Sequence, residues 1–230
     1  MIDGKATDRF ARVVAVLSFA VAAAAVVVAL LTLGEQQRQF RVLQSEQLTV
    51  LIDPRVDGPL RITDTHFGSL GHLVQVPWRL LLSNTGNQRL SVVRYDVSAC
   101  GTPGLTFYSG MDGGVVTADQ QPIALPVALD PGESVGFLIF VGILVTDDVY
   151  DVLSRQADLA AVTTMTATLL LGRQNLDLYG NPVVFQETGE GGYLLTVDPQ
   201  HQKSPTFCFE FATGRGNVFT HSASYYDSWE

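Results

Sequence analysis

VVAVLSFAVAAAAVVVALLTL, residues 13–33, divides the chain into an N-terminal anchor and a separate domain. This stretch of twenty-one residues carries no charge, and only Ser18 and Thr32 are mildly polar. As a helix rising ~1.5 Å per residue it would be about 30 Å long, which matches the hydrocarbon core of a bilayer. We therefore expect a transmembrane helix over Val13–Leu33.

Two other interpretations of this helix stay open at the level of sequence. A cleaved signal peptide has an apolar stretch of only ~7–15 residues and ends in small residues, whereas Leu30–Glu35 lacks an Ala-x-Ala pattern. A buried core helix is rarely apolar on all sides over so many turns. An uncleaved single-pass anchor fits the sequence best.

The orientation of the anchor follows from what lies on each side of it. Three basic residues precede the helix and two follow it, so the positive-inside rule gives a small bias. A short tail (1–12) precedes the anchor, whereas a whole domain follows it. We expect the N-terminus inside and the domain outside the inner membrane, in the periplasm.

The composition after the anchor excludes some partners. That part of the chain has 11 Lys+Arg against 21 Asp+Glu. Nucleic acid rewards basic patches, because phosphate contacts release counterions, so we expect no nucleic-acid partner. The Arg, Ala, Val and Leu bias indicates a GC-rich bacterial genome.

Cys100 and Cys208 are the only cysteines. In an exported domain they can form a disulfide, which would close a loop of over a hundred residues and contribute about 4–5 kcal/mol on the chain-entropy model. The alternative is two free, buried thiols. Neither cysteine belongs to a Cys-x-x-Cys pair, so a thioredoxin-like redox role has no support.

The periodicity of the sequence predicts a mainly β domain. We expect a helical stalk or linker over 34–46, a β domain over 47–213 and a C-terminal tail over 214–230. Alternation of period two predicts strands at Gln47–Ile52, His72–Ser83, Gln88–Val97, Ser134–Val145, Val162–Leu171, Val183–Glu187 and Tyr193–Val197, with Thr206–Phe211 as a further candidate. Thr146–Ala157 predicts one short crossing helix, with Thr146 as the N-cap.

Turn signals separate these runs. Ser83–Asn87 indicates a hairpin turn, and Asp130–Glu133 introduces the most apolar strand. The segments WRLLLSNTGNQRLSVVRYDV (78–97) and LDPGESVGFLIFV (129–141) resemble bacterial immunoglobulin-like modules, over about Trp78–Pro182. The resemblance implies an antiparallel immunoglobulin-like β-sandwich, an architecture that hosts many functions.

Val135–Val145 is apolar on both faces of the expected strand. A strand that faces water on one side alternates apolar and polar residues, so the second face must be covered by this chain or by a partner. We take Leu138, Phe140 and Leu144, together with the C-terminal aromatic residues, as a candidate interaction surface. Those aromatic residues are Tyr225, Tyr226 and Trp229.

The usual catalytic and phosphate-binding motifs are missing from the sequence. His66 and His72 could bind zinc, but the sequence identifies no third ligand. We assign no catalytic, cofactor-binding or metal-binding residue, and no cofactor. The expected function is non-enzymatic: a membrane-anchored scaffold that binds another membrane or envelope protein, as an accessory subunit of a larger assembly.

The alternative is a copper- or zinc-handling assembly factor that uses Cys208 and histidines among His66, His72, His201 and His221. The segment FCFEF at 207–211 is similar to the Cys-Phe-Cys-Phe motif of copper-delivery assembly factors of cytochrome oxidase. Here Thr206 takes the place of the first cysteine, and a single thiolate is a poor Cu(I) site.

Overall fold

The computed structural model of the chain describes residues 4–100, 107–156, 158–188, 192–198, 200, 202 and 204–226. In the N-terminal helix it describes side chains at 17–19 and 21–38. The chain divides into two units, Met1–Ser45 and Glu46–Glu230. Each unit is described by itself.

The first unit contains one described helix, α1 (Gly4–Gln44), which covers the expected anchor and the expected stalk up to residue 44. Within α1, the segment Leu17–Arg38 is long and apolar enough to cross a membrane, with a mean hydropathy of 2.4. The large apolar side chains there are exposed, as in Phe19 at 77% and Leu31 at 70%. The Thr32 hydroxyl donates to the Val28 carbonyl at 2.8 Å, so this polar group is satisfied within the helix, as hydrocarbon requires.

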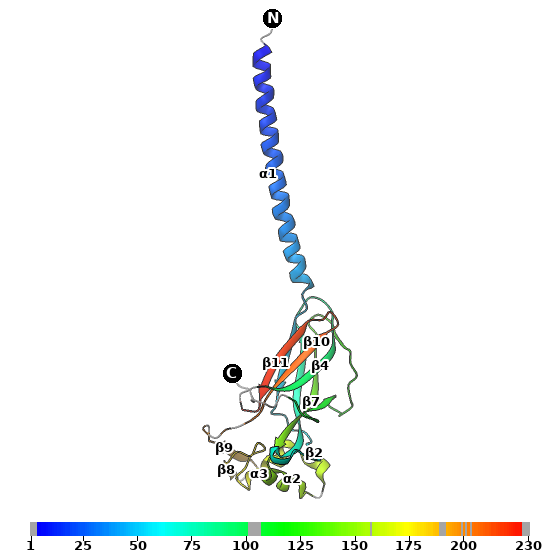
Figure 1. Cartoon of the computed structure of the whole chain (residues 1–230), viewed down its shortest axis with the longest axis vertical. Coiled ribbons are helices and arrows are strands. Elements are labelled where there is room, and N and C mark those ends of the chain that lie inside the picture. Colours follow the sequence, from blue (N-terminus) through cyan, green and yellow to red (C-terminus); the bar gives the residue numbers. More distant parts are fainter. Residues whose placement is uncertain are drawn as a thin grey trace. The chain divides into compact units, whose positions relative to one another are not determined.

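The second unit is mainly β, and all of its strand pairs are antiparallel (Figure 1). One five-stranded sheet has the order β1-β3-β7-β5, and β2 also pairs with β3. Its strands are β1 (Leu48–Asp53), β2 (Arg61–His66), β3 (His72–Asn84), β5 (Asp112–Val116) and β7 (Ser134–Val145). A four-stranded sheet has the order β11-β10-β4-β6. Its strands are β4 (Leu90–Cys100), β6 (Val127–Leu129), β10 (Thr206–Thr213) and β11 (Val218–Ser224).

The two sheets share one hydrophobic core. Trp78 of β3 is fully buried, and its ring lies 5.6 Å from that of Phe207 and 5.9 Å from that of Phe209, both on β10. Alternate residues of β7, Ile139 and Ile143 among them, are buried in the same core. The period-two pattern read from the sequence therefore marks the inward faces of these strands.

The middle of the outer face of β7, at Phe140 and Gly142, is covered by the chain itself. Phe140 is fully buried, and the guanidinium of Arg61 lies 3.5 Å from the centre of its ring. Arg61 also donates to the Gly113 carbonyl at 2.7 Å. Gly142 allows residues 108–113 to approach, because a Cβ there would lie 2.3 Å from the Gly110 carbonyl oxygen. Phe140 is therefore not available as a docking residue.

The cap, residues 146–198, lies at the end of the sheets where β3 begins and β7 ends (Figure 1). It contains α2 (Asp147–Ser154), the 3₁₀ turn η2 (Leu159–Ala161), α3 (Thr164–Gly172) and the hairpin β8 (Val183–Glu187) with β9 (Tyr193–Val197). The short crossing helix is confirmed as α2, with Thr146 at the N-cap position.

The strand predicted over Val162–Leu171 is wrong, because the chain forms α3 there. Thr163 caps the helix by accepting a hydrogen bond from the backbone N–H of Thr166 at 3.2 Å. Ala167 and Leu171 are fully buried, at the four-residue spacing of one helix face. The threonines alternate with other residues as they would in a strand, which led to the wrong prediction. The N-cap at Thr163 and the burial of one helix face stabilise a helix here.

Three connections differ from expectation. Ser83–Asn87 does not close a hairpin within one sheet, because β3 and β4 belong to different sheets. The expected C-terminal tail includes β11, which pairs with β10 from Val218 to Ser224. Short strands at β2, β5 and β6 were missed, since their sequences (RITDTH, DGGVV and VAL) lack a sustained apolar alternation.

The Cys100–Cys208 disulfide is present, with a Cα–Cα distance of 5.6 Å. It joins the neighbouring strands β4 and β10 of one sheet, where Cys208 lies opposite Ser98. The bond therefore fastens a strand pair that the sequence separates by 108 residues.

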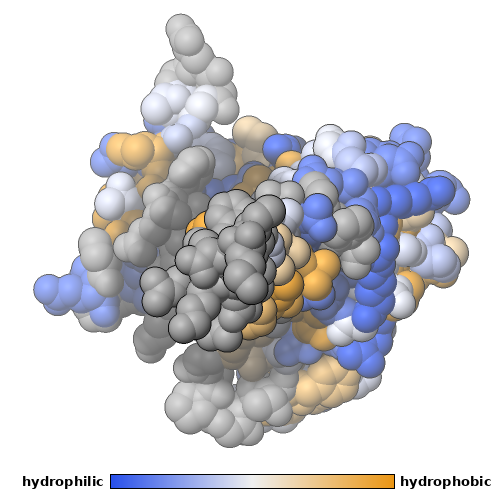
Figure 2. Space-filling model, turned by 90° about the horizontal axis from the view of Figure 1, so that it is seen from above, coloured by the Kyte–Doolittle hydropathy of each residue, from blue (hydrophilic) through white to orange (hydrophobic). Residues whose placement is uncertain are grey.

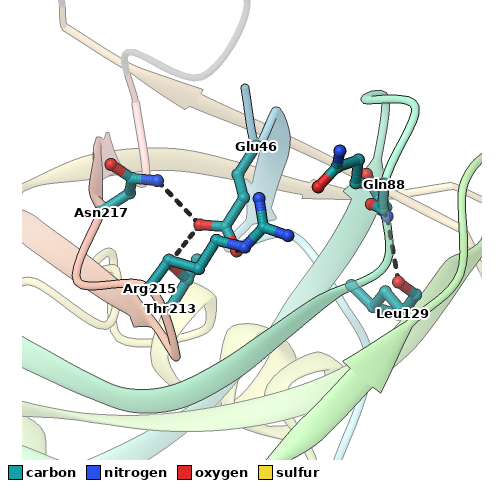
Figure 3. Close-up of polar contacts among 7 residues, drawn as sticks. Glu46, Gln88, Leu129, Thr213, Arg215 and Asn217 are labelled. Atoms are coloured by element: carbon teal, nitrogen blue, oxygen red, sulfur yellow. Dashed lines mark hydrogen bonds and ion pairs between the residues drawn. The ribbon is translucent and has the colours of Figure 1, made fainter. Parts of the chain in front are cut away.

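The opposite end of the second unit, where the chain enters it at Glu46, is held by a buried polar cluster (Figure 3). The Glu46 side chain is 2% exposed. Its Oε2 accepts hydrogen bonds from the Thr213 hydroxyl and from Asn217 Nδ2, the latter at 2.8 Å, and Arg215 Nε lies 3.8 Å from Oε1. Glu46 thus ties the first residue of the domain to the β10–β11 turn.

Candidate functional site

A tyrosine-lined pocket of about 490 Å³ is formed largely by the cap. Ligand sites commonly have volumes of ~300–1,000 Å³ and combine apolar walls with a few polar groups. The lining residues come from the β1–β2 loop, α3, the 177–179 turn, β9, the segment between β9 and β10, and the two residues after β11; they are Arg55, Thr164, Thr168, Asp177, Leu178, Tyr179, Tyr193, Leu194, Leu195, Val197, Gln202, Tyr225 and Tyr226.

Elsewhere on the described surface, exposed apolar side chains are spread over several elements. Outside α1, large ones among the described residues include Leu51, Val93 and Val218, which belong to different elements. Figure 2 shows one face of the molecule, on which hydrophobic and hydrophilic residues are interspersed. Scattered apolar residues of this kind need no functional explanation, so the pocket is the stronger candidate.

Three tyrosine rings form one wall of the pocket. Tyr179 and Tyr225 have ring centres 5.1 Å apart, Tyr225 and Tyr226 5.0 Å, and Tyr179 and Tyr226 5.9 Å. The last two pairs meet edge to face, a favourable arrangement for aromatic rings. The cluster therefore presents large, rigid rings at low cost in conformational entropy.

Asp177 and Arg55 hold this wall in place. Asp177 Oδ1 accepts hydrogen bonds from the backbone N–H groups of Tyr179 and Asn181, at 2.9 and 2.7 Å, and the Tyr226 hydroxyl donates to Oδ2. Arg55 donates through Nε and Nη2 to the Tyr225 carbonyl, at 3.2 and 3.1 Å. Both charged side chains thus position the aromatic residues.

Burial perturbs the acidity of these phenols. It raises the pKa of Tyr179 well above its ordinary value and also raises the pKa of Tyr225 and Tyr226, and the hydrogen bond to Asp177 raises the pKa of Tyr226 further. The Tyr179 hydroxyl is buried and has no hydrogen-bond partner among the described residues. The phenols therefore stay neutral near neutral pH and are available for packing and hydrogen bonding.

The β8–β9 hairpin supplies the apolar side of the pocket. A two-stranded hairpin is marginally stable alone. Within this one the rings of Phe185 and Tyr193 stack with centres 5.7 Å apart, and Phe185 also packs against α3. Gly172 at the end of α3 makes room for Phe185, because a Cβ there would lie 2.3 Å from the ring. Among the described residues, β9 pairs only with β8, so its second edge has no strand partner.

The structure separates the residues that the sequence proposed as one interaction surface. Tyr225 and Tyr226 line the pocket, and Trp229 lies outside the described residues. Leu138 and Leu144 are half-buried on β7, on either side of the buried Phe140. Most of the pocket was missed, because its residues come from six segments spread between Arg55 and Tyr226 and share no local motif.

The possible metal ligands considered in the sequence lie in different parts of the structure. His66, His72 and Asp147 converge at the cap, and their potential ligand atoms lie within 4.8 Å of one another. Cys208 is consumed by the disulfide, so it offers no thiolate. His221 lies on β11, and His201 is outside the described residues.

Comparisons of the chain with protein-family models, with curated proteins and with solved structures find no match. Its own sequence and geometry are therefore the basis for assigning a function.

Proposed function

We propose that this chain is a membrane-anchored binding protein without enzymatic activity, which holds its β domain outside the cytoplasm. The tyrosine-lined pocket docks an extended segment of another envelope protein, which makes the chain an accessory subunit of a membrane assembly. The pocket is the observation that carries this proposal.

Two features support the location. The Leu17–Arg38 segment of α1 has the length and apolar character of a membrane span. The Cys100–Cys208 bond fits an oxidising compartment such as the periplasm, since structural disulfides are rare in the cytosol.

The chemistry of the pocket favours a polypeptide ligand. Tyrosine is enriched at protein interfaces, where its ring gives contact area and its hydroxyl gives a hydrogen bond. The second edge of β9 adds backbone N–H and C=O groups to which an extended segment can pair by strand addition. Leu195 and Val197 of β9 line the pocket beside that edge and would contact side chains of the segment.

The strand order supports an immunoglobulin-like assignment for the domain. If β1, β3, β7 and β5 correspond to strands A, B, E and D, then β11, β10 and β4 correspond to G, F and C. Two hallmarks differ: the disulfide joins neighbouring strands of one sheet, and the buried tryptophan lies on the second strand in this correspondence. The likeness is therefore one of strand order only.

Site-directed photo-crosslinking of the full-length protein in its native membrane tests the docking proposal. A photoreactive residue at position 195 should capture one defined protein, whereas the same residue at Val184, exposed on the other strand of the hairpin and outside the pocket lining, should not. Leu195→Asn should abolish co-purification of that protein in mild detergent. Equal crosslinking from both positions, or none from position 195, would refute the proposal.

The metal-handling alternative loses its thiolate ligand, because Cys208 is bonded to Cys100. We therefore do not propose a metal-handling assembly factor that uses Cys208.

A further inference from the structure

We propose that His66, His72 and Asp147 form a zinc-binding site at the cap, apart from the tyrosine-lined pocket. The potential ligand atoms of the three side chains lie within 4.8 Å of one another. None of the three residues lines the pocket, so the site can be tested independently of the docking proposal.

Strand register explains why the two histidines meet. His66 ends β2, His72 begins β3, and the two residues are directly opposite in the antiparallel pair. A short 3₁₀ turn, η1 (Gly68–Leu70), connects them, and the Phe67 N–H donates to the Gly71 carbonyl at 2.8 Å. Opposite residues in a strand pair have Cβ atoms ~4.5–5.5 Å apart, so the hairpin holds both imidazoles on one face.

Strand register also explains why Asp147 lies close to His72. His72 pairs with Val145, the last residue of β7, and Asp147 follows two residues later at the start of α2. Gly71 makes the close approach feasible: its φ is +102°, and a Cβ there would lie 2.1 Å from the Val145 carbonyl oxygen. Three elements thus converge through backbone geometry, not through a local sequence motif.

Two of the three pairs of ligand atoms can be compared directly with a tetrahedral site. Two ligand atoms that each lie ~2.0–2.1 Å from zinc at the tetrahedral angle are about 3.3 Å apart. Asp147 Oδ1 lies 3.3 Å from His72 Nε2 and 4.0 Å from His66 Nε2. The second distance is long for a direct hydrogen bond, but an ion between the groups would need it to shorten by less than about 1 Å.

The His72 ring is held in the ligating orientation. It stacks on Tyr150 with ring centres 3.8 Å apart and planes inclined by 8°, and the Tyr150 hydroxyl donates to Asp64 Oδ1 at 3.4 Å. The Nε2 atom of His72 lies 3.3 Å from Asp147 Oδ1, so this ring nitrogen faces the proposed site.

The types of donor atom also favour zinc. Neutral imidazole is the ligating species, and it suits zinc, as carboxylate oxygen also does. With three protein ligands the fourth position is open to water, because the side chains of Asp147 and His66 are 78% and 47% exposed.

Isothermal titration of the chelator-treated full-length protein in detergent with Zn²⁺ tests the site. One equivalent should bind, and His66→Gln and Asp147→Asn should each weaken binding at least about tenfold. The matched controls His221→Gln and Asp148→Asn, a distant histidine and the neighbouring carboxylate, should bind as the wild type does. Ca²⁺, which prefers oxygen ligands, should not compete.

Cobalt(II) gives a second readout that does not depend on variants. The wild-type protein should develop the intense visible absorption of four-coordinate cobalt, and Zn²⁺ should displace it. Absence of stoichiometric zinc binding, unchanged binding in both ligand variants, equal binding of Ca²⁺, or a cobalt spectrum identical to that of the hydrated ion would each overturn the proposal.

Discussion

Asn84 shows how one buried side chain can organise a connection between two sheets. It is 1% exposed, and its Nδ2 donates to the Gln88 and Leu129 carbonyls at 2.8 and 3.0 Å, while its Oδ1 accepts from the Gly86 N–H at 3.0 Å. Figure 3 shows Gln88 and Leu129 on the two segments that the amide joins. The sequence marked a turn here but not the partner at Leu129, which only the fold brings near.

Asn84→Asp should therefore destabilise the domain strongly. A carboxylate has the same shape but cannot donate, so two buried carbonyls lose their partner and face a negative charge. We expect a loss of about 2–4 kcal/mol in the free energy of unfolding, measured by urea denaturation. Asn87→Asp, an exposed change in the same loop, should leave the midpoint almost unchanged. Equal midpoints for the two variants would contradict the role given to Asn84.

At the scale of elements, strands with a strong apolar pattern were predicted well. The predicted bounds of β7 (Ser134–Val145), β8 and β9 agree with the structure, because burial on a pleated surface follows the period of two. The segment that forms α3 was wrongly predicted to be a strand, because its conformation depends on tertiary contacts. Ala167 and Leu171 contribute to the common core, and the sequence does not reveal that contact.

The junction between α3 and the β8–β9 hairpin gives a sharp test of packing. Gly172→Ala would drive a methyl group into the Phe185 ring, which must shift. We expect a loss of about 1–3 kcal/mol, seen in thermal unfolding, and greater hydrogen exchange at the hairpin amides. Gly136→Ala on β7 is the control, since a Cβ there meets nothing within 4 Å. A neutral Gly172→Ala variant would refute this packing role.

The tyrosine wall should make the domain sensitive to alkali. Burial raises the pKa of Tyr225 in the folded protein above the value of about 10 in the unfolded chain. The folded state therefore retains a proton that the unfolded state releases, so this stabilisation is complete below pH ~10 and falls as pH rises beyond it. Urea midpoints across that range should decline less steeply for Tyr225→Phe than for the wild type. An identical decline would count against this linkage.

At the scale of the whole molecule, the disulfide controls the stability of the second unit. The bond closes a separation of 108 residues, so the Cys100→Ala/Cys208→Ala variant should lose about 4–5 kcal/mol by chain entropy. Urea unfolding with and without reductant measures the loss. Reductant should lower the midpoint of the wild type and leave that of the double variant unchanged. A wild type indifferent to reductant under unfolding conditions would contradict the expectation.

The division into an apolar helix and a β domain could be predicted because the two parts differ in sequence pattern: residues 13–33 are apolar throughout, and the later segments alternate apolar and polar residues. The sites could not, since they depend on distant residues meeting. His66 and His72 were visible as a pair six residues apart, but Asp147 joins them only through the pairing of β3 with β7. The pocket likewise needs Arg55, α3 and the end of β11 to meet.

The Glu46 cluster has a mechanical consequence. Any pull transmitted along α1 enters the domain at this residue, directly before β1. Because the Glu46 carboxylate is bonded to Thr213 and Asn217, the load is divided between β1 in one sheet and the β10–β11 turn of the other. Both sheets would then bear the tension together, and neither edge strand would be peeled away alone.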